Sequence, residues 1–360
     1  MSIALVRNHF RLKNMKNVIL LCGMRFLTFF CLAIMLSLSS TARCQERYRL
    51  VFWNVENLFD VWDDTTKNDD AFTPSGENHW TSQRYETKLS HICKTLVALG
   101  DSGKGRHSMP MLVGMAEVEN DKVLRDLCNG TPLRRYRYGY IHFESPDQRG
   151  IDNALLYRQK EFSPFLAETV RVSDSVEGFF TRDILLVGGV TRQGDTLFAI
   201  IVHMPSKRGG TTSERRRMVV AGRLRETMEQ VRQAYPGAAI VVAGDFNASP
   251  TEREIKVVLM HGLGGRFINL MEHMEPGRGS YKYLDHWSFI DQIIVSANML
   301  EGESGLFLSG REAHLFDAPF LLLDDEKYLG KKVFRTYQGI KYQGGYSDHL
   351  PVYIDMEHRR

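Results

Sequence analysis

The chain has 360 residues, of which 43% are hydrophobic, 25% charged and 11% aromatic, and this composition excludes the disordered, collagenous and coiled-coil classes. The formal net charge is +3, but residues 1–44 hold six of the basic side chains and no acidic one. The remainder has 40 basic and 43 acidic residues, so any affinity for nucleic acid must come from a local patch and not from bulk charge.

The first 44 residues have the pattern of an export signal. A basic start precedes an apolar run at residues 26–38, and small residues follow at 39–42. The apolar run is shorter than the roughly 20 residues that a membrane-spanning helix needs, which favours a signal peptide over a retained anchor. A start at Met15 or Met24 would give a leader of more usual length than one at Met1.

The cysteines do not form a disulfide scaffold. Three of the five lie in the leader, where Cys44 follows residues that match a lipoprotein signal poorly, so lipidation is a minor alternative. Cys93 and Cys128 fall within helical patterns, and we expect both to be buried as small apolar side chains. The sequence therefore predicts a signal peptide at residues 1–44 and one domain at residues 45–360, secreted or in the periplasm of a bacterium.

Past the leader, short apolar runs alternate with amphipathic stretches. Runs rich in Val, Ile, Leu and aromatic residues predict strands at 49–53, 111–115, 154–157, 184–187, 197–202, 240–242, 289–295 and 352–354. Apolar stripes predict helices at residues 82–99 and 213–231, the second capped by Ser213 and followed by Gly237. Strands interleaved with few helices predict an α/β or α+β sandwich.

Between the first strand and the first helix, residues 60–77 are acidic and have no periodicity. The aspartates admit a calcium-binding loop, but the EF-hand spacing and its final glutamate are missing. A solvated loop is the favoured interpretation, and a long ordered loop at this place would border a site.

Polar side chains interrupt or end the predicted apolar strands, a placement that costs stability unless the group is paired or binds a metal. These residues are Asn54, Glu56, Glu117, His203, Asp245, Asn247, Asp291, Asp348 and His349. One of them alone would be read as a cap, a turn or a structural histidine. Together they offer hard oxygen ligands and two imidazoles, a set suited to metal-assisted hydrolysis of a phosphate ester.

The motifs around these residues resemble the endonuclease/exonuclease/phosphatase superfamily, which includes deoxyribonuclease I, abasic-site endonucleases, neutral sphingomyelinases and inositol polyphosphate 5-phosphatases. The matches, in family order, are WNVENLFD at 53–60, MAEVEN at 115–120, RGIDNALLYR at 149–158, TRD at 181–183, VHMPSKRGG at 202–210, GDFN at 244–247, FIDQIIVS at 289–296 and SDHLPV at 347–352. The resemblance implies a four-layer sandwich like that of deoxyribonuclease I, with two packed β-sheets flanked by α-helices and the site at one end.

The resemblance also implies a divalent cation, Mg²⁺ or alternatively Mn²⁺, in the site. Asn54 and Glu117 are its implied main ligands, and Asp348 is an outer or second-metal ligand. The cation would offset the negative charge that grows on the phosphate in the transition state. Asp245 and Asn247 are the implied pair that positions the attacking water and holds the phosphoryl group.

The proton-transfer residues implied by the resemblance are the dyad Asp291 and His349, which would accept a proton from the attacking water. Asp245 is the alternative base. His203 is placed as in deoxyribonuclease I and the sphingomyelinases, where a histidine acts as an acid for the leaving oxygen or as a donor to phosphate. The abasic-site enzymes have a tyrosine in that region.

Four further residues are candidate substrate contacts. Asp152 is either a carboxylate partner of His203 or a turn residue, and Arg182 either contacts phosphate or forms a surface ion pair. Lys207 and Arg208, next to two glycines, would form a basic lip for a phosphate, although such a pair is often only part of a solvated loop.

The expected function is metal-dependent hydrolysis of phosphoesters, with extracellular nucleic acid as the first substrate class. The alternatives are a phosphatase, a sphingomyelinase-like lipid phosphodiesterase and, in another class, a noncatalytic binding module with the same fold. The sequence has no inositol-recognition motif and no basic stripe interleaved with aromatic residues for gripping duplex DNA. It implies no stable protein partner, and membrane contact only if the leader is retained.

Overall fold

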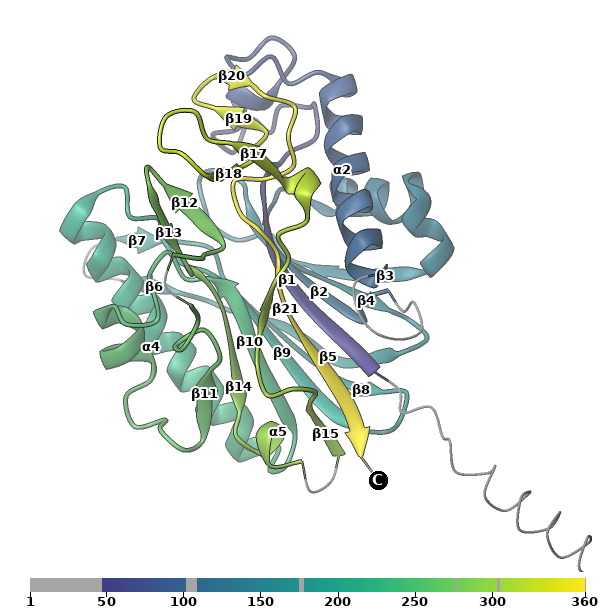
Figure 1. Ribbon diagram of the computed structural model, residues 1–360, viewed down its shortest axis with the longest axis vertical. Coiled ribbons are helices and arrows are strands. Elements are labelled where there is room, and N and C mark those ends of the chain that lie inside the picture. The colour runs from purple at the N-terminus through teal and green to yellow at the C-terminus, as the bar shows by residue number, and fades with distance from the viewer. Residues whose placement is uncertain (1–46, 102–108, 175–177, 276, 303–304, 360) are drawn as a thin grey trace, which may run out of the picture. The chain divides into compact units, whose positions relative to one another are not determined.

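Two β-sheets pack face to face in the computed structural model, which describes residues 47–101, 109–174, 178–275, 277–302 and 305–359 (Figure 1). The first sheet contains β1 (Arg47–Leu58), β2 (Leu112–Val118), β3 (Tyr138–His142), β4 (Asp152–Arg158), β15 (Gly305–Leu308), β16 (His314–Leu315) and β21 (Val352–Arg359). The second sheet contains β5 (Phe162–Val170), β8 (Ile184–Thr191), β9 (Thr196–His203), β10 (Ala239–Asp245), β11 (Phe267–Asn269) and β14 (Asp291–Ser296). Their orders are β15-β21-β1-β2-β4-β3, with β16 paired to β21, and β11-β14-β10-β9-β8-β5.

Helices and short hairpins complete the described part of the chain. The helical elements are α2 (Ser82–Asp101), α3 (Asp121–Arg125), α4 (Gly210–Ala234), α5 (Asn298–Glu301), η1 (Asp70–Phe72), η2 (Asp126–Gly130), η3 (Pro132–Tyr136), η4 (Glu254–Leu259) and η5 (Pro319–Leu321). The paired short strands are β6 (Ser173–Asp174) with β7 (Phe179–Phe180), β12 (Tyr281–Tyr283) with β13 (His286–Ser288), β17 (Leu322–Asp324) with β18 (Lys331–Val333), and β19 (Tyr337–Gln338) with β20 (Lys341–Tyr342).

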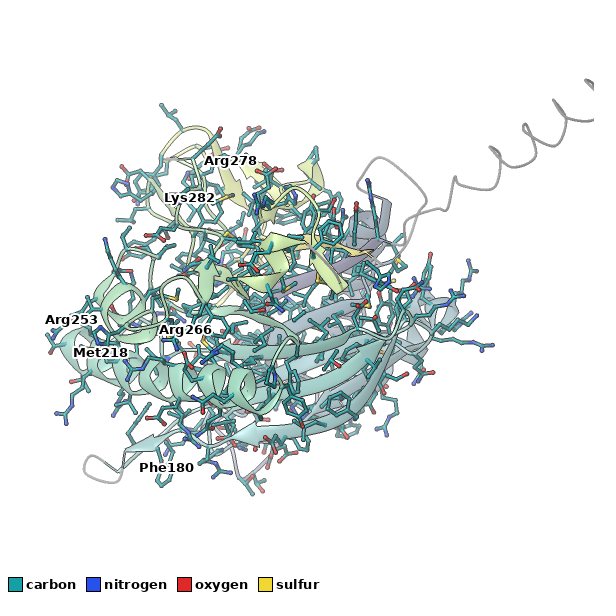
Figure 2. The ribbon with its side chains drawn as sticks, turned by 90° about the horizontal axis from the view of Figure 1, so that it is seen from below. Phe180, Met218, Arg253, Arg266, Arg278 and Lys282 are labelled. Carbon is teal, nitrogen blue, oxygen red and sulfur yellow. The ribbon has the colours of Figure 1, made fainter. Side chains whose placement is uncertain are left out.

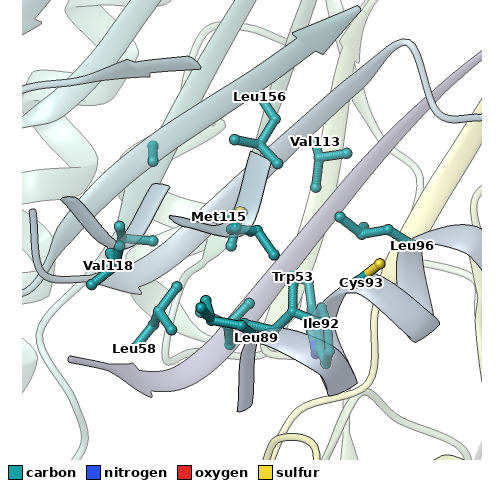
Figure 3. Packing of buried hydrophobic residues seen from close by; sticks show 14 of the residues in the cluster. Trp53, Leu58, Leu89, Ile92, Cys93, Leu96, Val113, Met115, Val118 and Leu156 are labelled. Atoms are coloured by element: carbon teal, nitrogen blue, oxygen red, sulfur yellow. The ribbon is translucent and has the colours of Figure 1, made fainter. Parts of the chain in front are cut away.

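The side-chain alternation of β1 divides the core on the two faces of the first sheet. Leu50 and Phe52 are buried against the second sheet, whereas Val51 and Trp53 belong to the cluster that includes the apolar face of α2. Figure 3 shows the latter cluster, in which Trp53 lies close to Ile92 of the helix. Burying each such side chain contributes about 1.5–3 kcal/mol, so the alternation fixes which face meets which layer.

The second sheet repeats this division. Ala199 and Ile201 of β9 pack in the core between the sheets, and Ile200 packs in the cluster with Leu224 and Met228 of α4. The layers therefore run α2, first sheet, second sheet, α4. This confirms the predicted sandwich of two β-sheets flanked by helices.

The strand directions bring the ends of several strands to one edge. β1 and β2 are parallel neighbours in the first sheet, as are β9 and β10 in the second. β21 and β14 run antiparallel to β1 and β10, so their first residues lie beside the last residues of those strands. Polar residues that end the parallel strands and begin β14, or directly precede β21, consequently meet at this edge.

The eight predicted strands and both predicted helices are present, with differences at the ends. The expectation that Ser213 caps the second helix is wrong, because α4 begins at Gly210 and Gly209 occupies the cap position with φ 117°. A glycine suits that left-handed conformation. The Ser213 hydroxyl instead donates to the Arg208 carbonyl oxygen at 2.7 Å.

The acidic segment after β1 is less solvated than predicted. Asp60 and Asp69 are buried, with only 4% and 2% of their surfaces exposed. Each carboxylate accepts a backbone N–H hydrogen bond within the segment, from Trp62 to Asp60 Oδ1 and from Asp64 to Asp69 Oδ2. These local bonds order the loop, which the absence of periodicity did not reveal, although Asp69 Oδ1 is buried without a partner among the described residues.

Cys93 and Cys128 are free and buried, as predicted. The predicted leader and its three cysteines lie outside the described residues. Arg47–Arg360 form one compact unit. Within the described ranges, none of the helices combines the length and the apolar character that crossing a membrane requires.

A buried lysine ties α2 to the segment around β19. Lys88 is 1% exposed, and its Nζ donates to Thr336 Oγ1 at 2.6 Å and to the Tyr346 carbonyl oxygen at 2.7 Å. Burial lowers the pKa of Lys88 to about 8 against the opposing effect of the nearby Glu56 carboxylate. Lys88 thus satisfies two buried acceptors and compensates a buried acid.

Replacing Lys88 with methionine is expected to lower the free energy of unfolding by about 2–4 kcal/mol, because both acceptors lose their donor and Glu56 loses a nearby positive charge in a dry environment. Urea denaturation measures this change. Lys94→Met is the matched control on the same helix, since Lys94 is exposed, donates to the Tyr346 hydroxyl at 2.9 Å and lies 4.5 Å from the centroid of the Phe320 ring. Equal losses in the two variants would contradict the role given to Lys88.

Candidate active site

Asp245 is the centre of the polar cluster at the shared edge of the two sheets. Its Oδ2 accepts a hydrogen bond from Asn54 Nδ2 at 3.0 Å and lies 3.5 Å from His203 Nε2 and 3.8 Å from His349 Nε2. Asp245 is directly paired with Asp291 of β14 and with His203 of β9 in the sheet register. The structure thus brings together these five predicted residues from both sheets.

The dyad of His349 and Asp291 is held rigidly. His349 Nδ1 lies 2.7 Å from Asp291 Oδ2, and both residues are buried. The Ser347 hydroxyl accepts the His349 backbone N–H at 3.0 Å and donates to the Asn54 carbonyl oxygen at 2.7 Å. Trp53 Nε1 donates to the His349 carbonyl oxygen at 2.9 Å, so the first strand fixes the position of the histidine.

Two of the site residues have left-handed backbone conformations, which set the direction of their side chains. Glu117 has φ 64° and Asn247 has φ 47°, and the pairing of β2 with β4 is irregular between Met115 and Val118. Such conformations cost about 1–3 kcal/mol at a non-glycine residue and persist only where the surroundings enforce them. Glu117 Oε2 accepts the Asn57 backbone N–H at 2.8 Å, and Asn247 Nδ2 donates to the Met204 carbonyl oxygen at 3.0 Å.

The ionisation of Asp245 and His349 is shifted in the same direction. Burial raises the pKa of Asp245 to about 7, with a further contribution from the Asp291 charge. Burial would lower the pKa of His349, but the carboxylates of Asp291, Asp245 and Asp348 outweigh it and raise that pKa well above its usual value. An acid that titrates near neutrality therefore lies beside a cationic imidazole.

His203 differs from His349 in its electrostatic surroundings. Burial lowers its pKa well below the usual value, and the positive charges of Arg182, Arg149 and His349 lower it further. Its Nδ1 is buried without a hydrogen-bond partner in the described structure. The ring is therefore neutral, which suits donation of a hydrogen bond to a phosphate oxygen better than full transfer of a proton.

A second group of charges backs the cluster on the side of β1. The Glu56 carboxylate accepts the backbone N–H groups of Thr336 and Tyr337 at 2.6 and 3.3 Å. Arg335 lies 3.5 Å from Glu56 Oε1 and donates to Asp348 Oδ2 at 2.9 Å. Burial and the charge of Asp348 raise the pKa of Glu56 to about 7.

The donor set of the cluster fits a hard divalent cation. Within the described residues, Asp245, Asp291 and His349 form a group whose ligand atoms all lie within 4.8 Å of one another, and Asp291 Oδ1 is buried without a partner. The His349 ring already bonds to Asp291, however, whereas the side chains of Glu117 and Asp348 keep 12% and 18% exposure. Their carboxylate oxygens are of the kind Mg²⁺ prefers, and the ligand roles of Asn54, Glu117 and Asp348 stay predictions.

The structure excludes one of the two alternatives for Arg182 and one of the two for Asp152. Arg182 is buried, donates to the His203 carbonyl oxygen at 3.3 Å and lies 3.5 Å from Asp147, so it is not a surface residue. The pairing of Asp152 with His203 is wrong, because Asp152 Oδ2 accepts the Ser145 backbone N–H at 3.2 Å. Asp152 begins a strand of the first sheet and turns towards the Ser145 loop.

Only one of the two cations in the predicted basic lip is available to bind a phosphate. Lys207 Nζ contacts both carboxylate oxygens of Glu252 at 2.9 and 2.8 Å, which neutralises its charge. Arg208 is exposed and has no side-chain ion pair in the described part of the chain. The lip therefore offers one unpaired cation, not two.

Sequence reasoning missed Arg149, Arg335 and Tyr281. Arg149 donates to Asn57 Oδ1 at 2.9 Å and lies 3.9 Å from Glu117 Oε1, and its place in the motif at 149–158 was an available signal. Tyr281 forms an isolated antiparallel bridge with His349, and the two ring centroids are 4.9 Å apart. Arg335 and Tyr281 come from segments without periodicity, which gave no signal.

Solved structures of other proteins share the fold of this chain. The chain resembles an endonuclease/exonuclease/phosphatase family protein of Bacteroides thetaiotaomicron, with 15% identity, TM-score 0.55, and coverage of 87% of this chain and 96% of the other. It resembles the human nocturnin catalytic domain with bound sulfate, with 16% identity, TM-score 0.51, and coverage of 87% and 95%. It also resembles D. rerio TDP2 in complex with a single-strand DNA product, with 16% identity, TM-score 0.51, and coverage of 86% and 99%.

These structural likenesses show the fold, and a comparison with curated proteins finds no match. The family assignment rests on the sequence. The profile of the Endonuclease/Exonuclease/phosphatase family matches residues 49–358, almost the whole described unit and all twelve predicted site residues. The chain belongs to the Endonuclease/Exonuclease/phosphatase family.

Proposed function

We propose that the chain is an exported, Mg²⁺-dependent phosphodiesterase that hydrolyses nucleic acid. The observation that carries this proposal is the contact of Asp245 with Asn54, His203 and His349 in one buried cluster. The family and the DNA complex of the similar TDP2 structure support a phosphodiester substrate. The composition of residues 1–44 supports export.

Asn54, Glu117 and Asp348 would hold the cation. When bound, Mg²⁺ supplies positive charge that offsets the negative charge developing on the phosphoryl oxygens. Asn54 Nδ2 also donates to Asp245, so one amide joins the cation ligands to the acid–base group. Arg335 fixes one oxygen of Asp348 and leaves its Oδ1 available.

Asp245 takes the proton from the attacking water. A base works best when its pKa lies near the working pH, and burial raises the pKa of Asp245 to about 7. The Asn247 backbone N–H donates to Asp245 Oδ1 at 2.9 Å and leaves Oδ2 facing the histidines. Between the two candidate bases, the geometry therefore favours Asp245 over the cationic His349.

The two histidines bind the phosphoryl group as hydrogen-bond donors. The charged ring of His349 is oriented through Nδ1 by Asp291, so its Nε2–H can donate to a phosphate oxygen. His203 is neutral and donates without adding charge, and Arg182 holds its backbone through the carbonyl oxygen. These donors act where negative charge grows during the reaction.

The purified chain from residue 45 to 360 is expected to cleave bis-p-nitrophenyl phosphate or plasmid DNA with Mg²⁺ or Mn²⁺. EDTA should remove at least about 99% of the rate, because the charge of the cation supplies several kcal/mol of transition-state stabilisation. Added Mg²⁺ should restore the rate, and circular dichroism before and after chelation controls for unfolding. Activity that persists in EDTA would refute a metal-dependent mechanism, and no turnover of any phosphoester would favour the noncatalytic alternative.

A further inference from the structure

A groove opens beside the candidate active site and shares its wall. It has a volume of about 340 Å³ and is lined by Arg208, Tyr281, Lys282, Tyr283, Leu284, Leu323, Asp325, Lys327, Tyr328, Lys332, Val333, Phe334, Arg335, Gln338 and Gln343. We call it the tyrosine groove. The Tyr281 ring lies against His349, with ring centroids 4.9 Å apart, and Arg335 bonds to Asp348, so the groove continues directly from the predicted catalytic residues.

Two hairpins form the walls of the tyrosine groove. The β12–β13 hairpin supplies Tyr281 and Tyr283, and the β17–β18 hairpin supplies Lys332; Figure 1 shows the two hairpins near one another above the sheets. Lys282, labelled in Figure 2, joins them, because its Nζ contacts Asp325 Oδ2 at 2.7 Å and donates to the Lys331 carbonyl oxygen at 3.0 Å. These contacts hold the two hairpins together, so the tyrosine groove has a defined shape.

The charge of the tyrosine groove is positive. Five cationic side chains line it against one acid, Asp325. Lys282 pairs with that acid, and Arg335 pairs with Asp348. Arg208 and Lys332 have no ion-pair partner within the residues that the structure describes, so they are available for anionic groups of a ligand.

Exposed rings and apolar side chains accompany these cations. Tyr283 is 66% exposed and the neighbouring Leu284 50%. Tyr328 lies near the ammonium of Lys327, which is 4.9 Å from the ring centroid. An anionic ligand without rings would use only the cations of the groove. Exposed tyrosine rings next to cations are suited to a single-stranded nucleic acid, because its unpaired bases have free faces for stacking.

We propose that the tyrosine groove binds the nucleotide next to the scissile phosphate of a single-stranded nucleic acid. This inference rests on the proposed function and adds the substrate class. The base stacks on Tyr283, and Arg208 and Lys332 contact the flanking phosphates. A duplex keeps its bases stacked on each other, so it presents the groove with phosphates but no free ring.

The test measures binding and turnover separately. The dissociation constant of a fluorescein-labelled hexathymidylate is measured by anisotropy in EDTA, and kcat/KM is measured with Mg²⁺ on the same oligonucleotide and on bis-p-nitrophenyl phosphate. Tyr283→Ala is expected to weaken oligonucleotide binding and kcat/KM by about 10- to 100-fold, since stacking contributes about 1–3 kcal/mol per base. Tyr283→Phe should retain both values, and hydrolysis of the small diester should stay within about twofold in each variant.

Lys332→Ala should weaken oligonucleotide binding and reduce the slope of log Kd against log salt by about one phosphate contact. The matched controls are Phe165→Ala and Lys160→Ala, an exposed ring and an exposed lysine outside the tyrosine groove, and both should leave binding unchanged. Circular dichroism of each variant verifies folding.

Three outcomes would overturn the proposal: no binding of the oligonucleotide, unchanged binding in Tyr283→Ala and Lys332→Ala, or equal binding of inositol hexakisphosphate that depends on Lys332 but not on Tyr283. The last would identify an anion without rings as the ligand. The unaltered protein could also bind the oligonucleotide, lose this binding in both groove variants, and hydrolyse no diester. That result would support binding of nucleic acid in the tyrosine groove and refute the proposed function. The two failures are therefore distinguishable.

Discussion

Replacing His349 with alanine is expected to lower kcat for bis-p-nitrophenyl phosphate by about 10²- to 10⁴-fold, the range typical of a positioned acid–base or oxyanion-stabilising group. The ring lies 3.8 Å from Asp245 and 2.7 Å from Asp291. Its removal takes away a cationic donor and leaves Asp291 as a buried carboxylate without its partner. Steady-state kinetics at saturating Mg²⁺ measure the loss.

The chain contains a matched control for this substitution. His358 lies on β21, the strand that follows His349 in the chain, and forms a similar pair with Asp195, with Nδ1 and Oδ2 2.8 Å apart. His358→Ala removes an equivalent imidazole–carboxylate bond away from the cluster and should retain full kcat. If both variants lost activity equally, the effect of His349 would be structural, and the assigned role would be wrong.

Much of the site was predictable from the sequence, because a polar residue at the end of an apolar strand lowers the stability of the fold unless it is paired or binds a metal. Asn54, His203 and Asp245 each interrupt or close a run of buried residues, and the parallel pairing of their strands places those ends at one edge. The continuous apolar run from Leu50 to Trp53 likewise predicted a strand, and the structure buries both faces of it. Local patterns suffice where strand periodicity decides the direction of a side chain.

Other parts of the site depend on contacts that no local pattern contains. Arg335 meets Glu56 across 279 positions of sequence, and Lys88 meets Tyr346 from a helix on the outer face of the first sheet. The segment from β17 to β20 has no periodicity, yet it carries both Arg335 and one wall of the tyrosine groove. Its placement follows from buried hydrogen bonds to Lys88 and Glu56, which become visible only in the folded chain.

Asp152 shows the limit of reasoning from motifs. It lies within a matched segment, so a partnership with His203 was a reasonable expectation. The carboxylate instead accepts the Ser145 backbone N–H, and burial raises the pKa of Asp152 to about 6. Asp152 lies opposite Val118, directly after an irregularity in the pairing of β2 and β4, and a backbone irregularity of this kind has no sequence signature here.

Asp245→Asn is expected to lower kcat by about 10²- to 10⁴-fold, because the amide has nearly the shape of the carboxylate but cannot accept a proton. Stability should respond differently. The pKa of Asp245 is about 7 in the folded chain and 3.8 in its ordinary state, so the folded protein binds more protons and the contribution of this group to stability is lost as pH rises through 7. Without metal at pH 8, the variant should therefore be at least as stable as the unaltered protein.

The pair of measurements separates a catalytic role of Asp245 from a structural one. Thermal unfolding in EDTA at pH 5 and pH 8 should show the relative stability of Asp245→Asn increasing at the higher pH, while kcat with Mg²⁺ stays low at both. Asp195→Asn, which alters the carboxylate paired with His358, is the matched control and should keep its activity. A variant of Asp245 that retains more than about a tenth of kcat would exclude this residue as the base and return that role to His349.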